Sequence, residues 1–190
     1  MNSNHMNDHH TIERIHPVPH RAGEIFLAGG CFWGTEEYLG RVRGVVSTDV
    51  GYANSRVPGP TYEQVCQGAP HAAETVRVVY DPAVLPLGRL LEIFFQSIDP
   101  CAVNRQGGDV GAQYRTGIYY VDEADRPVIA AALESLAATA PGPIAVEHMP
   151  LENYWAAEER HQQYLKKNPG GYCHIPQRLF GYAGTANEEA

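Results

Sequence analysis

The sequence contains few cysteines and no paired metal-binding cysteines. Its four cysteines, Cys31, Cys66, Cys101 and Cys173, are too few and too widely spaced for a disulfide scaffold in a chain of 190 residues. No two of them form a CxxC pair, which excludes the standard zinc-ribbon and thioredoxin-type sites. The remaining interpretations are buried thiols, a catalytic thiol, or a catalytic thiol with a resolving partner.

The sequence also lacks an excess of positive charge and a long apolar run. Fourteen Lys and Arg residues against 22 Asp and Glu residues give a net charge of -8. This balance argues against nucleic acid and anionic membranes as partners, because both require a basic face. No run of about 18 apolar residues occurs, and the N-terminus lacks the pattern of a signal peptide. We expect a cytoplasmic monomer without a bound metal or cofactor.

One catalytic domain over residues 22–190 is expected to follow a flexible tail over residues 1–21. A chain with 44% hydrophobic residues at this length can bury a core without covalent staples. The tail is polar and contains five histidines, but no acidic or cysteine partner lies at ligand spacing. We therefore expect a solvated tail and not a metal site.

Hydrophobic periodicity predicts a mixed α/β fold. Alternating or continuous apolar runs predict strands over residues 24–30, 45–52, 74–81, 115–121 and 144–149. Apolar residues at helical spacing predict helices over residues 35–39, 86–98, 123–138 and 154–171. The order β-α-β-β-α-β followed by α-β favours a two-layer ferredoxin-like sandwich, with an irregular C-terminal tail after residue 171.

The stretch GGCFWG over residues 29–34 places a cysteine where a strand ends and a helix begins. Unpaired N–H groups and the helix dipole favour an anion there, so Cys31 is a candidate for a thiol of lowered pKa. The flanking glycines allow a substrate to approach the sulfur. Phe32 and Trp33 are poorly placed for core packing and are expected to wall a small apolar pocket. A structural cysteine in a tight turn with a hydrophobic plug is the alternative.

Further motifs give a family resemblance that extends over residues 25–174. After GCFWG come GYANS, YEQVCQG, AETVRVVYDP, DPCAVNRQGGDVGAQYRTGIYY, AAEERHQQYL and NPGGYC. In this order they resemble the A-type peptide methionine sulfoxide reductases. The resemblance implies that Cys31 attacks the sulfur of methionine S-sulfoxide, free or in proteins, releases methionine and becomes a sulfenic acid.

The resemblance identifies Glu74 as the general acid that protonates the sulfoxide oxygen. The strand pattern supports this role independently, because alternation puts Glu74 on the apolar face of Val76, Val78 and Tyr80. A carboxyl group at the margin of such a face has its pKa raised by desolvation. A solvent-facing carboxylate at the strand end is the alternative.

Three more residues match polar positions of the family. The hydroxyls of Tyr52 and Tyr114 would bond the sulfoxide oxygen, and Asp109 would orient substrate or water. Alternation puts Tyr52 on the same face as Val46 and Val50. Without the resemblance, the tyrosines would be interpreted as core-edge residues and Asp109 as a turn residue.

The resemblance also implies a recycling step. Cys173 in GGYC matches the cysteine that converts the sulfenic acid of Cys31 into a disulfide, which thioredoxin then reduces. The preceding Gly-Gly pair suits a mobile segment from about residue 168 that can move a thiol onto Cys31.

Two departures from the family pattern concern side chains near the expected site. The chain has PHAAE where Gly-His-Ala-Glu is usual, so Glu74 keeps its register while His71 comes one position early. Cys101 replaces a commoner threonine and is either inert or a competing resolving thiol. We expect Cys66 to be a buried structural thiol.

Three other functions fit parts of the sequence. A Cys-His hydrolase would need an imidazole beside Cys31, and a thiol peroxidase would have no use for an aromatic pocket or a sulfoxide-directed acid. A peptide-binding module would grip a side chain with Phe32 and Trp33 and would keep binding after Cys31→Ser. We expect His161 to pack or to form a surface hydrogen bond.

Overall fold

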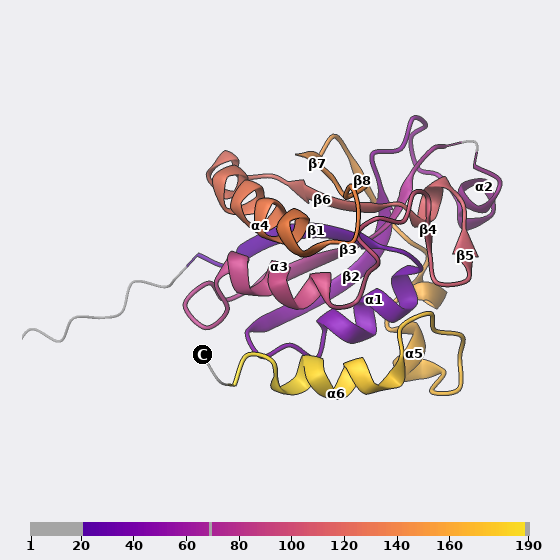
Figure 1. Ribbon diagram of the computed structural model, residues 1–190. Coiled ribbons are helices and arrows are strands. Elements are labelled where there is room, and N and C mark those ends of the chain that lie inside the picture. The colour runs from indigo at the N-terminus through magenta and orange to yellow at the C-terminus, as the bar shows by residue number, and fades with distance from the viewer. Residues whose placement is uncertain (1–20, 69, 189–190) are drawn as a thin grey trace, which may run out of the picture.

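The computed structural model describes residues 21–68 and 70–188 and confirms a mixed α/β fold (Figure 1). The expected flexible tail lies outside these residues except for Arg21. A six-stranded sheet has the order β7-β6-β1-β3-β2-β8. Its strands are β1 (Gly23–Gly29), β2 (Val45–Ala53), β3 (Ala73–Tyr80), β6 (Thr116–Tyr120), β7 (Glu147–Pro150) and β8 (Tyr154–Ala156). A separate hairpin consists of β4 (Arg105–Gln106) and β5 (Asp109–Val110).

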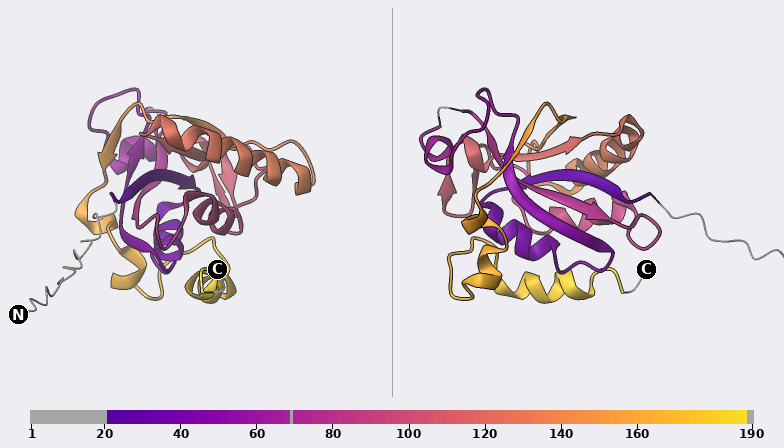
Figure 2. Two further views of the ribbon diagram at one scale, coloured as in Figure 1. Left: turned by 90° about the vertical axis from the view of Figure 1, so that its left-hand side faces the viewer. Right: turned by 180° about the vertical axis from the view of Figure 1, so that it is seen from behind.

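Helices α1 (Phe32–Leu39) and α3 (Leu87–Phe95) cover one face of the sheet (Figures 1 and 2). Helix α4 (Arg126–Thr139) packs against α3, and α6 (Gln177–Thr185) runs along α1. The short helices are α2 (Tyr62–Cys66) and α5 (Tyr164–Lys167), with single 3₁₀ turns at η1 (Ala112–Tyr114), η2 (Glu123–Asp125) and η3 (Glu159–His161). No helix within the described ranges is long and apolar enough to cross a membrane.

Strand β1 is buried on both faces, and its alternation divides the core in two. Ile25 and Leu27 belong to the large core shared with α1 and α3. Phe26 and Ala28 point the other way into a smaller cluster, where the rings of Phe26 and Tyr154 meet edge to face at 4.9 Å. Burial of β1 from both sides fixes the position of the loop that follows it.

The strand register brings three chain segments together at one end of neighbouring strands in the sheet. β1 and β3 are antiparallel with Leu27 opposite Val76, so the end of β1 lies beside the beginning of β3. β2 and β3 pair with Tyr52 opposite Glu74. Cys31, Glu74 and Tyr52 therefore come from three neighbouring strand ends.

Two predictions about individual elements need correction at their boundaries. Helix α1 begins at Phe32, directly after Cys31, and not at residue 35. Val46 is 65% exposed instead of sharing the buried face of Val50. The register of β2 against β3 shifts between Val45 and Ser47, so a bulge at Val46 turns its side chain out.

Two predictions about the C-terminal part are wrong. Residues 154–171 do not form one helix, because β8 pairs with β2 and Gln163 has a left-handed backbone with φ of 52° immediately before α5. The tail after residue 171 is not wholly irregular, because α6 packs Leu179, Phe180 and Ala183 against the core. Pro176 and the glycines within residues 177–185 disguise its helical pattern in the sequence.

Candidate active site

Cys31 occupies the N-cap of α1, at the end of a turn that only glycine accommodates. Gly30 has φ of +90°, and a Cβ there would lie 2.6 Å from Cβ of Gln106. The Cys31 side chain is buried, and the backbone N–H groups of Trp33 and Gly34 act to lower its pKa without a side-chain hydrogen bond that caps the helix. As expected, the sulfur sits where the first N–H groups of a helix converge.

The pKa of the Cys31 thiol is nevertheless raised, contrary to the expected lowering. Burial contributes most, and the negative charges of Glu74 and Asp109 add to it. The N–H groups of Trp33 and Gly34 act in the opposite direction but do not outweigh burial. Cys31 therefore rests as a thiol and has to lose its proton when it reacts.

Glu74 is a buried carboxyl group beside the start of α1. Only 1% of the residue is exposed, and its Oε2 accepts the backbone N–H of Phe32 at 3.1 Å. Its pKa is raised to about 8, chiefly by burial; the Phe32 N–H opposes this rise, and the charge of Asp109 adds to it. Among the residues that the structure describes, Oε1 has no hydrogen-bond partner. At neutral pH Glu74 is therefore mostly protonated and has an oxygen free to donate to a ligand.

An aromatic cluster surrounds the two side chains that follow Cys31. Phe32 is fully buried, with ring centroids 5.9 Å from Tyr52 and 5.6 Å from His161. Trp33 stacks on Tyr164 at 3.9 Å, and its indole N–H donates to Nδ1 of His161 at 3.1 Å. The cluster forms an apolar wall at the N-terminus of α1. Phe32 belongs to the buried core, contrary to the expectation that it is poorly placed for core packing.

The two predicted tyrosines have different surroundings. Burial raises the pKa of the Tyr114 hydroxyl, and the charges of Glu74 and Cys31 raise it further, which places Tyr114 beside both groups. The Tyr52 hydroxyl donates to Oε2 of Glu158 at 2.8 Å. Its proton is therefore directed toward Glu158, which the sequence did not indicate.

Asp109 joins the hairpin β4–β5 to the segment that carries Cys173. Its Oδ1 accepts the Tyr172 hydroxyl at 3.0 Å, and its Oδ2 lies 3.9 Å from Nδ1 of His174. The His174 ring also lies within hydrogen-bond distance of the Gly29 carbonyl, at 3.0 Å from Nε2. Asp109 thus contacts the residues on either side of Cys173.

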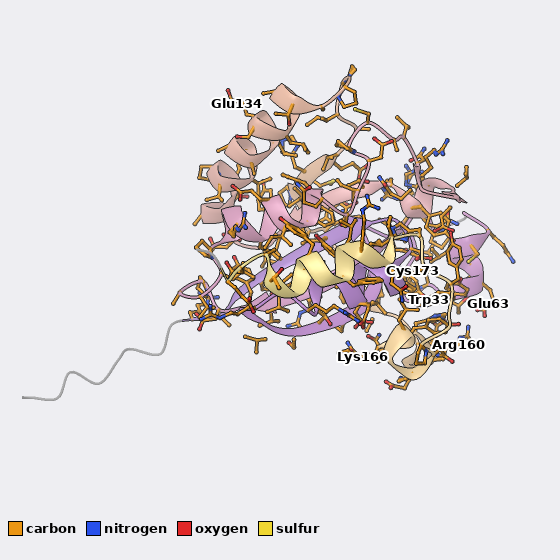
Figure 3. All side chains as sticks on the ribbon, turned by 60° about the horizontal axis from the view of Figure 1, so that its bottom comes forward. Trp33, Glu63, Glu134, Arg160, Lys166 and Cys173 are labelled. Carbon is orange, nitrogen blue, oxygen red and sulfur yellow. The ribbon has the colours of Figure 1, made fainter. Side chains whose placement is uncertain are left out.

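Cys173 lies against the first turn of α1, near Trp33 (Figure 3). A Cβ on Gly34 would be 2.8 Å from its Sγ, so the absence of a side chain at Gly34 allows this approach. The backbone N–H of the same Gly34 acts to lower the pKa of Cys31. Both sulfurs therefore lie near one residue.

The other two cysteines and His71 lie apart from this arrangement. Cys66 is exposed at the end of α2 and not buried as predicted, because only Val65 of that short helix points into the core. The Cys101 thiol contacts the carbonyl of Gly142 at 3.4 Å. His71 is exposed in a tight turn with φ of 52°. All four cysteines are free.

Sequence reasoning missed Tyr62, Glu158 and Tyr164, and assigned packing or a surface hydrogen bond to His161. These residues come from α2, from the segment between β8 and α5, and from α5 itself, so no periodicity links them to Cys31. Their only sequence signal is their place in YEQVC and in EERHQQY. His161 accepts the Trp33 N–H, and within the described part of the chain no imidazole is hydrogen-bonded to Cys31, which disfavours a Cys-His hydrolase.

No group of three or more metal-binding side chains occurs in residues 21–68 and 70–188. The arrangement around Cys31 has instead a thiol, a neutral carboxyl group, an apolar wall and a second thiol. A thiol beside a proton donor can remove an oxygen atom from an oxidised apolar side chain, and the two thiols can then form a disulfide.

Comparison with known proteins agrees with this chemistry. The family model described as peptide methionine sulfoxide reductase matches residues 23–187. The peptide methionine sulfoxide reductase MsrA of Lachnoclostridium phytofermentans is 53% identical over 162 residues, which cover 85% of this chain and 98% of that protein. Reduced Mxr1 from Saccharomyces cerevisiae has a TM-score of 0.77 at 38% identity, covering 85% of this chain and 94% of that chain. Mxr1 in complex with Trx2 has a TM-score of 0.56 at 25% identity, covering 86% and 94%.

Proposed function

Since the chain belongs to the peptide methionine sulfoxide reductase family and reduces methionine sulfoxide by cysteine chemistry, we propose which of its residues carry the reaction. Cys31 is the nucleophile, Glu74 the general acid, and Cys173 the recycling thiol. The observation that carries the proposal is the neutral, buried Glu74 beside Cys31, with its Oε1 unpartnered among the described residues.

In the first step the Cys31 sulfur attacks the sulfur of methionine sulfoxide. Protonated Glu74 gives its proton to the sulfoxide oxygen, and the carboxylate so formed takes up the proton lost by the Cys31 thiol. The bond between oxygen and the methionine sulfur and the transient bond between the two sulfurs then break, and a bond between oxygen and the Cys31 sulfur forms. Methionine leaves reduced, and Cys31 is oxidised to a sulfenic acid. This transfer explains how a thiol of raised pKa reacts.

In the second step Cys173 attacks the sulfenic sulfur of Cys31, and the sulfenic oxygen leaves as water. The position of both sulfurs near Gly34 supports the short travel that this step needs. A dithiol then reduces the Cys31–Cys173 disulfide. The complex of Mxr1 with Trx2 supports thioredoxin as that reductant. We further propose that the segment from about residue 168 moves during this exchange.

Phe32 and Trp33 bind the methyl group of the substrate, while Tyr52, Tyr114 and Asp109 arrange the polar groups around the oxygen. A pocket that grips only the end of the side chain suits both free and protein-bound substrate of the S epimer. The strand order β6-β1-β3-β2, connected by α1 and α3, supports a ferredoxin-like core. Four free thiols support a reducing compartment such as the cytoplasm, where the protein would act as a monomer in oxidative-damage repair.

Steady-state turnover tests the proposal. The wild type should release methionine from the S epimer and not from the R epimer, with either dithiothreitol or thioredoxin as reductant. Cys31→Ser should abolish release with both reductants, whereas Cys173→Ser should abolish only the thioredoxin-supported reaction. Cys101→Ser serves as the matched control and should change neither. Activity that survives Cys31→Ser would contradict the proposal.

A further inference from the structure

We propose that Glu158 is a positioning residue of the reductase, which acts by holding the hydroxyl of Tyr52 in a fixed direction. Glu158 follows β8 on a loop that reaches the aromatic cluster. This inference rests on the proposed function and adds to it a residue that does not itself touch Cys31 or Glu74 through any hydrogen bond found in the described chain.

The Glu158 carboxylate accepts two hydrogen bonds from the walls of the site. Its Oε2 accepts the Tyr52 hydroxyl at 2.8 Å, and its Oε1 accepts the backbone N–H of Tyr62 at 3.0 Å. Burial acts to raise the Glu158 pKa, but these bonds and the nearby His161 outweigh it, so the net pKa is lowered. Glu158 is therefore an ionised acceptor that leaves Tyr52 no choice but to donate.

Tyr52 stands between Glu158 and the proposed acid. It pairs across the strands with Glu74, and the charge of Glu74 affects the pKa of its hydroxyl. With its proton committed to Glu158, the Tyr52 oxygen has only lone pairs to present toward the protonated Glu74, and it cannot donate to a sulfoxide oxygen as the resemblance implied. Tyr52 then acts as an acceptor in the site, while Glu74 and Tyr114 supply protons.

A second contact links Glu158 to the apolar wall. Nδ1 of His161 accepts the Trp33 indole N–H, so a neutral His161 carries its proton on Nε2, which lies 3.9 Å from Oε2 of Glu158. Arg160 Nε lies 3.2 Å from the same Nε2. A neutral imidazole cannot accept at both nitrogens, and the exposed Arg160 also pairs with Glu63 at 2.7 Å through its Nη2 atom (Figure 3). Glu158 thus accepts hydrogen bonds on the polar side of the site and lies 3.9 Å from the imidazole on its apolar side.

Glu158→Gln separates this role from simple support of the loop. Glutamine has one carbonyl oxygen, and if that oxygen keeps the Tyr62 N–H, its amide group faces Tyr52 and donates to it. The substitution therefore reverses the direction of the Tyr52 hydroxyl while the fold is retained. Glu159→Gln is the matched control, because Glu159 is 88% exposed in its side chain and pairs with Lys167.

The test is a double-mutant cycle on the rate constant of methionine release in single turnovers at saturating S-epimer substrate. Glu158→Gln and Tyr52→Phe should each lower it by about 10- to 100-fold, the loss expected for one charged hydrogen bond. The double variant should be no slower than the slower single variant. Glu159→Gln should match the wild type. If Gln lowers thermal stability, Glu158→Asp is the second variant: it keeps a carboxylate that can only accept, so the rate should recover toward that of the wild type.

Two results would overturn the inference alone. One is an active wild type in which Glu158→Gln has no effect. The other is a loss of rate that does not depend on the Tyr52 hydroxyl. The double variant would then lose the product of the two single losses, or Glu158→Gln would raise KM equally with and without the Tyr52→Phe substitution. Support of the Tyr62 loop would act in this independent way. A wild type that releases no methionine would instead overturn the proposed function and this inference with it.

Discussion

The backbone N–H of Phe32 donates a hydrogen bond of 3.1 Å to Oε2 of Glu74. The residue next to the proposed nucleophile therefore fixes the proposed acid, although the two are 42 positions apart in the chain. The bond occupies one carboxyl oxygen and leaves the other facing the site. The same contact opposes the rise in pKa that burial causes, and so keeps the pKa of the carboxyl group near neutrality instead of far above it.

Glu74→Gln should affect the two chemical properties of Cys31 in opposite directions. Methionine release should fall by about 100- to 10,000-fold, because glutamine cannot give up a proton to the sulfoxide oxygen. Above the Glu74 pKa of about 8, alkylation of Cys31 by iodoacetamide should become faster, because removal of the negative charge of the ionised Glu74 lowers the raised pKa of the thiol.

Quantitative mass spectrometry of the peptide containing Cys31 measures the alkylation separately from the other thiols. Glu134→Gln, on the exposed surface of α4, is the control and should leave both rates unchanged. Slower or equal alkylation in Glu74→Gln would show that the charge of Glu74 does not act on Cys31.

The stability of the fold should also report the ionisation of Glu74. Its folded pKa of about 8 exceeds the ordinary value of 4.5, so the folded state binds the proton more tightly than the unfolded state. The corresponding contribution to stability is fully present below about pH 4.5 and is lost as pH rises through about 8.

Urea unfolding from pH 5 to 9 measures this loss. The free energy of unfolding of Glu74→Gln, relative to that of the wild type, should increase with pH by up to about 5 kcal/mol. Parallel pH dependences of the two proteins would mean that Glu74 titrates normally.

Gly34→Ala should separate the two steps of the reaction. A Cβ at this position would lie 2.8 Å from Sγ of Cys173, so the recycling segment cannot dock as it does in the wild type. The first turnover should still release methionine, whereas formation of the Cys31–Cys173 disulfide should slow by at least about tenfold, a barrier of about 1.4 kcal/mol.

Rapid quench with thiol trapping follows both events in one experiment. Gly181→Ala is the matched control, since a Cβ there meets nothing within 4 Å. A normal rate of disulfide formation in Gly34→Ala would contradict the proposed route of Cys173.

Trp33→Phe should weaken substrate binding more than chemistry. Phenylalanine keeps an aromatic face but loses the indole N–H that fixes the ring to His161 at 3.1 Å. KM should rise by about tenfold, with a smaller change in kcat, as expected when uniform binding is lost. Trp155→Phe, at the exposed edge strand β8, should leave KM unchanged. A fall in kcat without a change in KM would mean that Trp33 orders the reacting groups instead of the methyl pocket.

The sequence predicted the residues whose placement follows from local patterns. Alternation placed Glu74 on the buried face of β3, and the residue is 1% exposed. The junction of a strand and a helix placed Cys31 at the start of α1. In both cases a local pattern, either alternation or the boundary between two elements, determines where the side chain lies, and tertiary packing is consistent with that position.

Properties that depend on distant segments could not be predicted in this way. The aromatic cluster combines Phe32 with Tyr62, His161 and Tyr164, which lie on three other segments. Pairing with β2 made residues 154–156 a strand in spite of their helix-like sequence. The raised pKa of Cys31 likewise follows from burial and from Glu74 and Asp109, and not from its own helix.

A single turnover without reductant tests the central claim most directly. The protein is mixed with the S epimer of methionine sulfoxide, methionine is counted per enzyme, and disulfides are mapped by mass spectrometry. The account predicts about one equivalent of methionine and a bond between Cys31 and Cys173. A bond between Cys31 and Cys101 would contradict the assignment of Cys173, and the absence of methionine would contradict the proposed chemistry of Cys31.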